Sequence, residues 1–280
     1  MKKLCVIGDP IGHSKSPLIQ NAMLRAAGLD FVYHAQTVTG NDTARWLEQA
    51  KQEGYGGFNA TMPHKENLVP LMDELSADAA LFRSVNTVCI REGKAYGFNT
   101  DGDGFLQALR EAGMDPAGRA VLVLGAGGAA KAVTAKLVQA GAAQVCIANR
   151  TTDRAEVLCR TIGSASLSAH DFSRETLCSL AGGSDLVVNC TSLGMTGTAG
   201  RFEDLSFLEK LRPGSGVFDL IYSPARTDLL RKAEALGLTV SNGLGMLVWQ
   251  AVFALELFTQ SKPDRAALAA IARKTLEEHL

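Results

Sequence analysis

The sequence predicts an α/β protein of two domains, and three observations support this. Apolar runs of four to six residues alternate with helical patterns almost throughout, as is typical of βα units stacked on largely parallel sheets. The chain has 280 residues, whereas a typical domain has about 150. A polar stretch at residues 113–119 separates an irregular first part from a more regular βαβ series.

Composition and charge exclude several classes of protein. Hydrophobic residues make up 46% of the chain, and 28 Lys and Arg balance 29 Asp and Glu, so no net field attracts nucleic acid or anionic lipid. The apolar run 4–7 is too short for a signal peptide, and the uncharged stretch 235–255 contains three glycines and several polar residues, unlike a membrane helix. We therefore expect no nucleic-acid partner and no membrane partner. Because the six cysteines are scattered without a C-x-x-C pair, we also expect a cytoplasmic protein with no metal site.

The first predicted unit is a strand at residues 4–7 followed by a helix. Ser16 is expected to cap this helix, with Pro17 at its first position and Gly28 at its end, because these residue types are favoured there. The pattern then predicts a strand at 31–35, a helix around 46–50 that closes at Gly54, a short strand at 57–59 and a helix entered through Pro63.

An antiparallel hairpin is expected next, from residues 85–90 and 95–99 around the turn Arg91-Glu92-Gly93-Lys94. This departure from the βα pattern predicts a first domain with its own topology and a boundary near residues 101–118. The regular series that follows ends near Asn242. Two last helices, at residues 246–259 and 264–278, could either complete the second sheet or pack back on the first domain.

A glycine-rich turn opens the second part. The apolar strand at 120–124 runs directly into the segment GAGGAA at 125–130, and a helical pattern follows to residue 140. Glycines let the backbone turn sharply and approach a pyrophosphate, whose charge lies at the positive end of the helix. Such a turn can also serve packing alone, but strand, turn, helix and second strand all have the expected lengths. The sequence predicts a Rossmann-type domain that binds a dinucleotide through Gly125, Ala126, Gly127, Gly128 and Ala129.

The end of the next strand, residues 144–148, predicts which dinucleotide is bound. NAD enzymes usually carry Asp or Glu there to hold the ribose 2′-hydroxyl, whereas this chain has Asn149-Arg150-Thr151, with Arg154 one helical turn later. A carboxylate repels a 2′-phosphate, and a guanidinium forms charge-assisted hydrogen bonds with it. The residues therefore predict NADP, although the arginines would look the same at a solvated helix entrance.

Asn and Thr residues end three short apolar runs in the first part, at Asn59-Ala60-Thr61, Asn86-Thr87 and Asn99-Thr100-Asp101. Because the carboxyl ends of strands converge on one crevice in an α/β sheet, we expect these side chains to line a pocket for a small polyhydroxylated ligand. Ser14 and Ser16 add hydroxyls at the entry of the first helix, where a carboxylate would also meet free N–H groups. Each piece alone is also explained as an ordinary turn or cap.

Lys65 and Asp101 are candidates for a proton relay. Lys65 follows the first of these runs and Asp101 closes the third. In a partly dehydrated cleft, Asp101 would orient the ammonium group while Lys65 gives or takes the alcohol proton as hydride moves. A surface lysine and a helix-capping aspartate would look identical in sequence.

Seven short segments occur in a characteristic order along the chain: 8–17 (GDPIGHSKSP), 59–65 (NATMPHK), 85–87 (VNT), 99–102 (NTDG), 125–130 (GAGGAA), 149–151 (NRT) and 243–250 (GLGMLVWQ). This ordered set resembles the shikimate dehydrogenase family over essentially the whole chain. The resemblance implies reversible reduction of 3-dehydroshikimate to shikimate by NADPH in the shikimate pathway, with Lys65 and Asp101 as the catalytic pair and the C-terminal helices packed on the first domain.

Further roles also follow from the resemblance. Ser14 and Ser16 would hold the substrate carboxylate. The implied domains are a substrate domain of residues 1–103 plus 243–280 and an NADP-binding domain of residues 104–242, in a monomer or homodimer. The ring hydroxyls of the substrate would contact Asn59, Thr61, Asn86, Asp101, Tyr222 and Gln250, and the nicotinamide half of NADP would lie against Thr191, Leu220, Gly243 and Met246.

One departure from the family leaves other functions open. Members usually carry Gly-Ala before the Val-Asn-Thr segment, whereas this chain has Arg83-Ser84. The alternatives are a dehydrogenase of quinate or another cyclic hydroxy acid, and a module that senses NADP or a metabolite without turnover. The presence of Lys65 and Asp101 counts against the second alternative.

Overall fold

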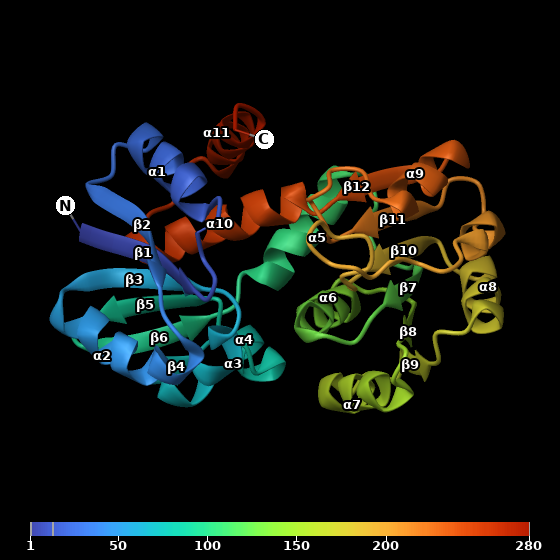
Figure 1. The fold of residues 1–280 in the computed structure, drawn as a ribbon, viewed down its shortest axis with the longest axis horizontal. Helices are drawn as coiled ribbons and strands as arrows, with labels where there is room; N and C mark the ends of the chain where they lie inside the picture. The colour runs from blue at the N-terminus through green and yellow to red at the C-terminus, as the bar shows by residue number, and fades with distance from the viewer. Residues whose placement is uncertain (1, 13, 280) are drawn as a thin grey trace. The chain divides into compact units, whose positions relative to one another are not determined.

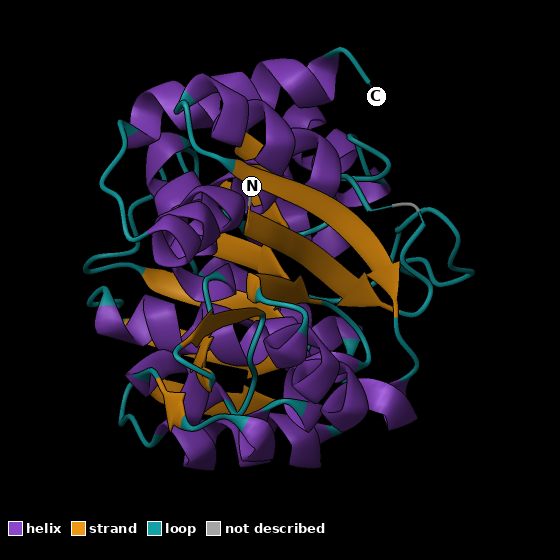
Figure 2. Cartoon of the chain, turned by 90° about the vertical axis from the view of Figure 1, so that its left-hand side faces the viewer, coloured by secondary structure: helices purple, strands orange, loops and turns teal. Residues whose placement is uncertain are grey.

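The chain forms two compact units, each with its own six-stranded sheet and helices packed against it (Figures 1 and 2). The structure, a computed structural model, describes residues 2–12 and 14–279, so His13 of the first matching segment lies outside the described residues. One unit is Met1–Gly104 with Val248–Leu280, and the other is Phe105–Leu247. Within the described part of the chain, no helix is both long and apolar enough to cross a membrane.

The sheet of the first unit is mixed, in the order β2-β1-β3-β5-β6-β4. The predicted hairpin is confirmed: β5 is antiparallel to β6, and also to β3. This reversal corrects one expectation, because Asn86-Thr87 stands at the beginning of β5 and not at the end of a strand. The beginning of β5 therefore lies at the same edge as the carboxyl ends of β3 and β6. The strands are β1 Lys2–Gly8, β2 Phe31–Thr37, β3 Tyr55–Ala60, β4 Glu74–Leu75, β5 Thr87–Arg91 and β6 Lys94–Phe98.

Helix α11 and the part of α10 from Val248 onward belong to the first unit, and these helices do not complete the second sheet. Helix α11 lies beside α1 (Figure 1), and Gln20 Nε2 donates to the Ala251 carbonyl of α10 at 3.0 Å. The expected cap of α1 is wrong, because Ser16 is already helical and Lys15 at the N-cap makes no side-chain cap bond. The helices are α1 Ser16–Ala26, α2 Thr43–Gln52, α3 His64–Asn67, α4 Ala77–Phe82, α10 Leu244–Thr259 and α11 Arg265–Glu277, with 3₁₀ turns η1 Gly40–Asp42 and η2 Val69–Leu71.

The core of the first unit packs α2 against the sheet. The Trp46 indole meets the rings of Tyr55 and Phe58 edge-on, at centroid distances of 5.5 and 6.4 Å. Gly57 has φ +157°, and a Cβ there would lie 2.4 Å from the Val88 carbonyl oxygen, so only glycine lets β3 approach β5 this closely. This close pairing holds the polar strand ends together at one edge.

The second unit is the predicted regular βα series, with a fully parallel sheet in the order β12-β11-β10-β7-β8-β9. The sequence pattern predicted a domain boundary near residues 101–118, but a helix, α5, forms in the first part of this stretch. Phe105, Ala108 and Leu109 are buried at helical spacing, and the Phe105 ring meets Phe218 edge-on at 5.2 Å. The elements are α5 Asp101–Glu111, β7 Ala120–Leu124, α6 Gly128–Gln139, β8 Gln144–Ala148, α7 Thr152–Ile162, β9 Leu167–His170, α8 Arg174–Gly182, β10 Leu186–Asn189, η3 Ser206–Lys210, β11 Gly216–Asp219, α9 Asp228–Ala235 and β12 Thr239–Asn242.

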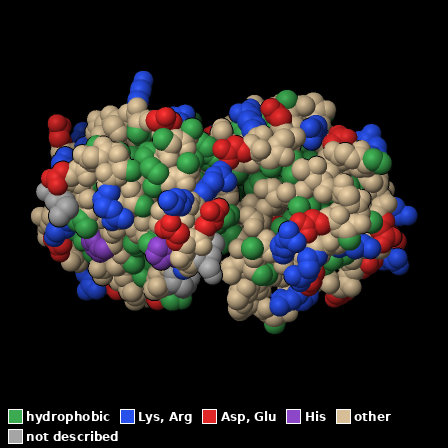
Figure 3. All heavy atoms as spheres, turned by 90° about the horizontal axis from the view of Figure 1, so that it is seen from above, with side chains coloured by type: hydrophobic (Ala, Val, Ile, Leu, Met, Phe, Trp, Pro, Cys, Tyr) green, Lys and Arg blue, Asp and Glu red, His purple; other side chains and the backbone are tan. Residues whose placement is uncertain are grey.

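Charged side chains lie on the surface, and three of the cysteines lie in the core. Basic and acidic side chains are interspersed on the face shown in Figure 3. All six cysteines are free thiols, and Cys5, Cys89 and Cys146 are buried. Burial raises the pKa of Cys89 to about 12 and also raises the pKa of Cys5. These thiols behave as small hydrophobic core residues.

Candidate active site

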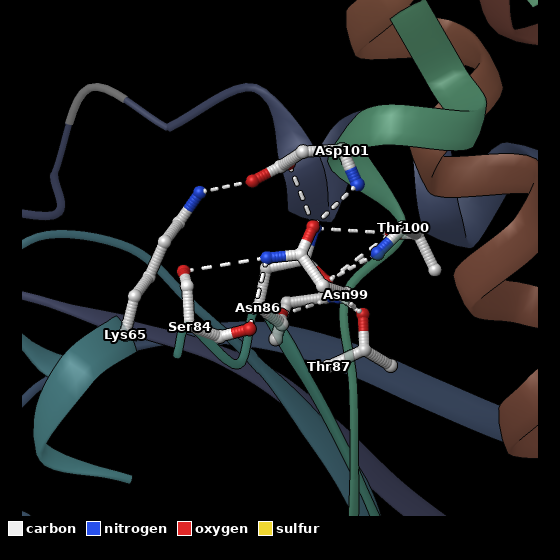
Figure 4. Close-up of polar contacts among 8 residues, drawn as sticks. Lys65, Ser84, Asn86, Thr87, Asn99, Thr100 and Asp101 are labelled. Atoms are coloured by element: carbon white, nitrogen blue, oxygen red, sulfur yellow. Dashed lines mark hydrogen bonds and ion pairs between the residues drawn. The ribbon is translucent and has the colours of Figure 1, made fainter. Parts of the chain in front are cut away.

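Lys65 and Asp101 form an ion pair at the polar edge of the first unit's sheet (Figure 4). The Lys65 Nζ atom donates to Asp101 Oδ2 at 2.6 Å, from the short helix α3 to the first residue of α5. Their side chains are 33% and 17% exposed, so the pair is partly dehydrated yet reachable by a small ligand. The structure thus brings together two residues that the sequence could only nominate; their catalytic roles stay predictions.

A network of amides fixes the Asp101 carboxylate. Asn86 Nδ2 donates to Asp101 Oδ1 at 2.8 Å, which leaves Oδ2 for Lys65. Asn99 Oδ1 accepts from the Asp101 backbone N–H at 3.1 Å, and Asn86 Oδ1 accepts from the Thr100 N–H at 2.9 Å. Asp101 also lies in the first turn of α5, where a negative charge is favourable. The carboxylate is therefore held in one orientation before any ligand binds.

Lys65 is fixed through its own backbone and its neighbour His64. The Lys65 carbonyl accepts from the Val85 N–H at 2.8 Å. The buried His64 ring bonds the Val38 carbonyl through Nε2 and the Thr43 hydroxyl through Nδ1, each at 2.8 Å. Burial lowers the pKa of His64, against a raising effect of the Val38 bond. His64 therefore anchors α3 to the residues around it. Among the described contacts, the ammonium group of Lys65 bonds Asp101 alone.

Asn59 is the residue before the last of β3 and contacts Asn86 of the site. Its Nδ2 donates to the Asn86 carbonyl at 3.1 Å and to Thr87 Oγ1 at 2.9 Å, while its Oδ1 accepts from the Tyr33 hydroxyl at 2.7 Å. Asn59 is 8% exposed, so its amide mainly ties three strands together. Sequence reasoning missed Tyr33, which carries no signal beyond its strand pattern.

The remaining predicted substrate residues lie in both units. Thr61 directly follows β3, and its N–H donates to the Ile7 carbonyl of β1 at 3.0 Å. Ser14 and Ser16 are half-buried where the chain leaves that edge for α1, and Ser14 Oγ accepts from the Ser16 N–H at 3.3 Å. Gln250 lies on α10 in the first unit, whereas Tyr222 follows β11 in the second. Thr61, Asn86 and Asp101 therefore lie at one sheet edge of the first unit, whereas Tyr222 belongs to the second unit.

The glycine turn of the second unit fits a dinucleotide. Gly125 has φ +102°, and a Cβ there would lie 2.9 Å from Thr191 Cγ2, so glycine is required. Gly127 and Gly128 are exposed, and a Cβ on either would meet nothing within 4 Å. Helix α6 begins at this turn and has no acidic residue in its first turn. Its free N–H groups thus face open space with no competing carboxylate on the helix, as a pyrophosphate requires.

The end of β8 lies against this turn. Asn149 Oδ1 accepts from the Ala126 N–H at 3.2 Å, and Asn149 Nδ2 donates to the Thr151 carbonyl at 2.8 Å. Arg150, Thr151 and Arg154 are all exposed at the start of α7. Two guanidinium groups are therefore placed where a ribose 2′-phosphate would meet them, at the end of the second strand of the βαβ unit.

A hollow beside Arg150 was not anticipated from the sequence. It has a volume of about 190 Å³, and two of its walls are the stacked rings of Phe172 and Phe202, with centroids 6.3 Å apart. Arg174 and Arg201 also line it. These four residues come from two separate stretches of the chain, at 172–174 and 201–202, and belong to none of the motifs, so only the fold could reveal the hollow.

The residues predicted at the nicotinamide end also lie at the carboxyl edge of the second sheet. Thr191 follows β10 and packs on Gly125. Leu220 follows β11, and a Cβ on Gly243 would lie 1.9 Å from its carbonyl oxygen, so Gly243 must be glycine. Met246 is half-buried in the first turn of α10. Thr191 thus contacts the glycine turn, and Leu220 contacts Gly243.

Known proteins resemble this chain over its whole length. Three family models match: the shikimate dehydrogenase substrate binding domain at 6–88, shikimate/quinate 5-dehydrogenase at 108–200, and the shikimate 5′-dehydrogenase C-terminal domain at 243–273. The shikimate dehydrogenase (NADP(+)) of Geobacter metallireducens is 41% identical over 280 residues, covering 96% of this chain and 97% of that protein.

Solved structures of similar proteins share the fold. Shikimate 5-dehydrogenase of Thermus thermophilus, in complex with NADP(H) and shikimate, has a TM-score of 0.84 at 34% identity, covering 98% of this chain and 100% of that chain. Quinate dehydrogenase of Corynebacterium glutamicum, in complex with NAD, has a TM-score of 0.88 at 31% identity, covering 98% and 99%.

Proposed function

Because this chain belongs to the shikimate dehydrogenase family, we propose that it is an NADP-dependent oxidoreductase that interconverts 3-dehydroshikimate and shikimate. The observation that carries the proposal is the 2.6 Å ion pair of Lys65 and Asp101, held by Asn86 at a polar sheet edge. A module that only senses a metabolite would not need an ammonium group aimed by a pre-oriented carboxylate. The reaction acts on a CH–OH group and requires one proton donor.

The proton is handled by residues of the first unit. Bound NADPH supplies the hydride that reduces the C3 carbonyl of the substrate. Lys65 donates a proton to the carbonyl oxygen, and in the reverse direction it takes the proton of the alcohol. Asp101 accepts a hydrogen bond from Lys65 and keeps the ammonium aimed at one point. Asn86 in turn prevents the carboxylate from rotating.

Polar groups around this pair bind the substrate. We assign the substrate carboxylate to the hydroxyls of Ser14 and Ser16 at the start of α1. The backbone N–H groups of these two residues already donate within the chain, to the Ile11 carbonyl and to Ser14 Oγ, so the hydroxyls are the expected donors. Asn59 mainly supports the floor, since its amide already bonds the protein. We assign the ring hydroxyls to Thr61, Asn86, Asp101, Tyr222 and Gln250, with Asn59 beneath them as a support.

The dinucleotide is held by the second unit. The turn Gly125-Ala126-Gly127-Gly128-Ala129 receives the pyrophosphate, and the exposed guanidinium groups of Arg150 and Arg154, with Asn149 and Thr151, hold the 2′-phosphate. Thr191, Leu220, Gly243 and Met246 are assigned to the nicotinamide half. We propose residues 104–242 as the NADP-binding domain and residues 1–103 plus 243–280 as the substrate domain, with Gly243 and Met246 contributing to the dinucleotide site from the start of that last segment.

We also propose the setting in which the protein works. Its partners are small molecules, without nucleic acid or membrane, and the chain acts as a monomer or homodimer. The six free cysteines suit a reducing compartment, which we take to be the cytoplasm.

A panel of steady-state assays tests the function. NADP⁺ and NAD⁺ are each paired with shikimate and quinate, and NADPH or NADH formation is followed by its absorbance. The largest kcat/KM is expected for NADP⁺ with shikimate. A larger value with quinate would favour the alternative suggested by Arg83-Ser84. Absence of turnover with every pair would refute the proposal and favour a sensor.

A further inference from the structure

A buried carboxylate in the second unit has no part in the chemistry above. Asp219 ends β11 and is 0% exposed. It accepts hydrogen bonds from Asn189 Nδ2 at 2.9 Å, the Ile221 N–H at 3.1 Å and Thr227 Oγ1 at 2.6 Å. These donors are all neutral, so they offset only part of the cost of removing a carboxylate from water. Burial accordingly raises the pKa of Asp219.

The first arm of this network leads from Asp219 to Thr191. Asn189 lies opposite Asp219 in the pairing of β10 with β11 and is also fully buried. Because a carboxylate only accepts hydrogen bonds, Asn189 must turn its NH₂ group toward Asp219 and its oxygen away. That oxygen accepts from both the backbone N–H of Thr191, at 3.0 Å, and its hydroxyl, at 2.7 Å. Asp219 thus fixes the conformation of Thr191 through the orientation of one amide.

The second arm holds the chain on either side of Leu220. The Ile221 N–H donates to Asp219 Oδ1, and the Leu220 N–H donates to the Asn189 carbonyl at 3.0 Å. The Leu220 carbonyl lies so close to Gly243 that a Cβ on Gly243 would be 1.9 Å from its oxygen. Thr227, the third partner of Asp219, also caps α9, since its hydroxyl oxygen accepts from the Leu230 N–H. One carboxylate therefore ties the loops after β10 and β11 to the start of a helix.

We propose that Asp219 is a positioning residue for the nicotinamide end of the dinucleotide, fixing Thr191 through Asn189 and Leu220 through Ile221. This inference rests on the proposed function, which assigns Thr191 and Leu220 to that end. The glycine turn at 125–129 and Arg150 make no described contact with Asp219. Thr191, at the end of the first arm, also packs on Gly125 of the turn. Loss of the carboxylate should consequently affect the nicotinamide half most and the 2′-phospho-ADP-ribose half much less.

Binding of a whole and a truncated ligand tests this selectivity. Calorimetric titration of wild type and Asp219→Asn uses NADP⁺ and 2′-phospho-ADP-ribose, which lacks the nicotinamide. The Kd of NADP⁺ should rise on the order of tenfold in Asp219→Asn. The Kd of 2′-phospho-ADP-ribose should change much less. Equal weakening of both ligands would mean a general structural role and would overturn the proposal, as would no change in either.

Matched variants separate this role from stability. Asp185 lies just before β10, at the opposite end of the strand, and accepts from the Ala120 N–H at 3.0 Å. Asp185→Asn is therefore the same substitution in the same sheet, and it should leave the ratio of the two Kd values unchanged. If Asp219→Asn does not fold, Thr227→Val removes one donor and should give the same selective loss, while Thr227→Ser should restore NADP⁺ binding. A selective loss that is absent from Thr227→Val overturns the proposal.

The two hypotheses fail separately. If wild-type protein binds NADP⁺ but turns over no substrate, the proposed reaction is wrong while the binding comparison still decides the role of Asp219. If wild type turns over shikimate and both ligands weaken equally in Asp219→Asn, only the positioning role is wrong.

Discussion

Replacing Lys65 by arginine separates positive charge from proton donation. Arginine keeps the charge and can still bond Asp101, which Lys65 reaches at 2.6 Å. A guanidinium group, however, does not give up its proton at any physiological pH. If Lys65 is the proton donor, Lys65→Arg should therefore lose activity almost as fully as Lys65→Ala.

The geometry sets the size of the two effects. Because Lys65 and Asp101 are 33% and 17% exposed, their ion pair contributes at most about 1 kcal/mol to folding. The melting temperature of Lys65→Arg should thus stay within a few degrees of wild type, on the order of 4 °C. Loss of a positioned proton donor costs roughly 10²- to 10⁴-fold in kcat. The loss of activity therefore greatly exceeds any loss of folded protein.

The assay measures kcat for the oxidation of NADPH with 3-dehydroshikimate as substrate. The melting temperature of the same samples is measured by circular dichroism. Lys51→Arg is the control, because Lys51 also pairs with a carboxylate, Glu48 at 2.9 Å, but on the surface helix α2. It should match wild type in both measurements. A Lys65→Arg variant that keeps more than about a tenth of wild-type kcat would refute the reasoning, since the expected loss is at least 10²-fold.

Four further outcomes are expected. Arg150→Asp should raise KM for NADP⁺ much more than KM for NAD⁺, because the lost hydrogen bond to the 2′-phosphate contributes roughly 1.5 to 3 kcal/mol to binding. Equal losses with both cofactors would remove the 2′-phosphate assignment. Gly125→Ala should lower the unfolding free energy by about 1 to 3 kcal/mol in urea titrations, because φ is +102° and the new Cβ would lie 2.9 Å from Thr191; an unchanged midpoint would contradict this. Arg83→Gly should stabilise the fold by up to about 1 kcal/mol, since Arg83 ends α4 with φ +50°; a loss in the same titration would show that its side chain matters. Burial lowers the pKa of His64 in the folded protein, so the stability that depends on a neutral His64 is complete above the unfolded pKa of about 6.5 and is lost as the pH falls through the lower folded pKa. The fall should be shallower in His64→Gln, and an equal slope in both proteins would exclude His64 as its source.

Periodicity predicted most of the fold, and the exceptions have physical causes. The parallel second sheet and the β5–β6 hairpin follow from short apolar runs and a turn. Helix α5 was missed because Gly102 and Gly104 are poor helix formers near its start. Burial of Phe105 and Leu109 outweighs that local preference, and it becomes visible only when Phe218 is in place.

The site was predicted as residue types but not as a geometry. Lys65 and Asp101 are 36 positions apart, and local patterns carry no information on their distance. Asn86 was found for a partly wrong reason, since it precedes an antiparallel strand and reaches the same edge by the reversal of β5. The aromatic hollow beside Arg150 and the Asp219 network depend on contacts between loops, which no single motif contains.

Alkylation of the buried cysteines can report unfolding of each unit in the unmodified sequence. Cys5 and Cys89 lie in the first unit and Cys146 in the second, all inaccessible to alkylating reagents while the chain is folded. Pulse labelling with mass spectrometry should then assign each opening event to one unit by which peptide becomes modified. A dinucleotide that protects only Cys146 would identify the unit that holds it without any introduced probe.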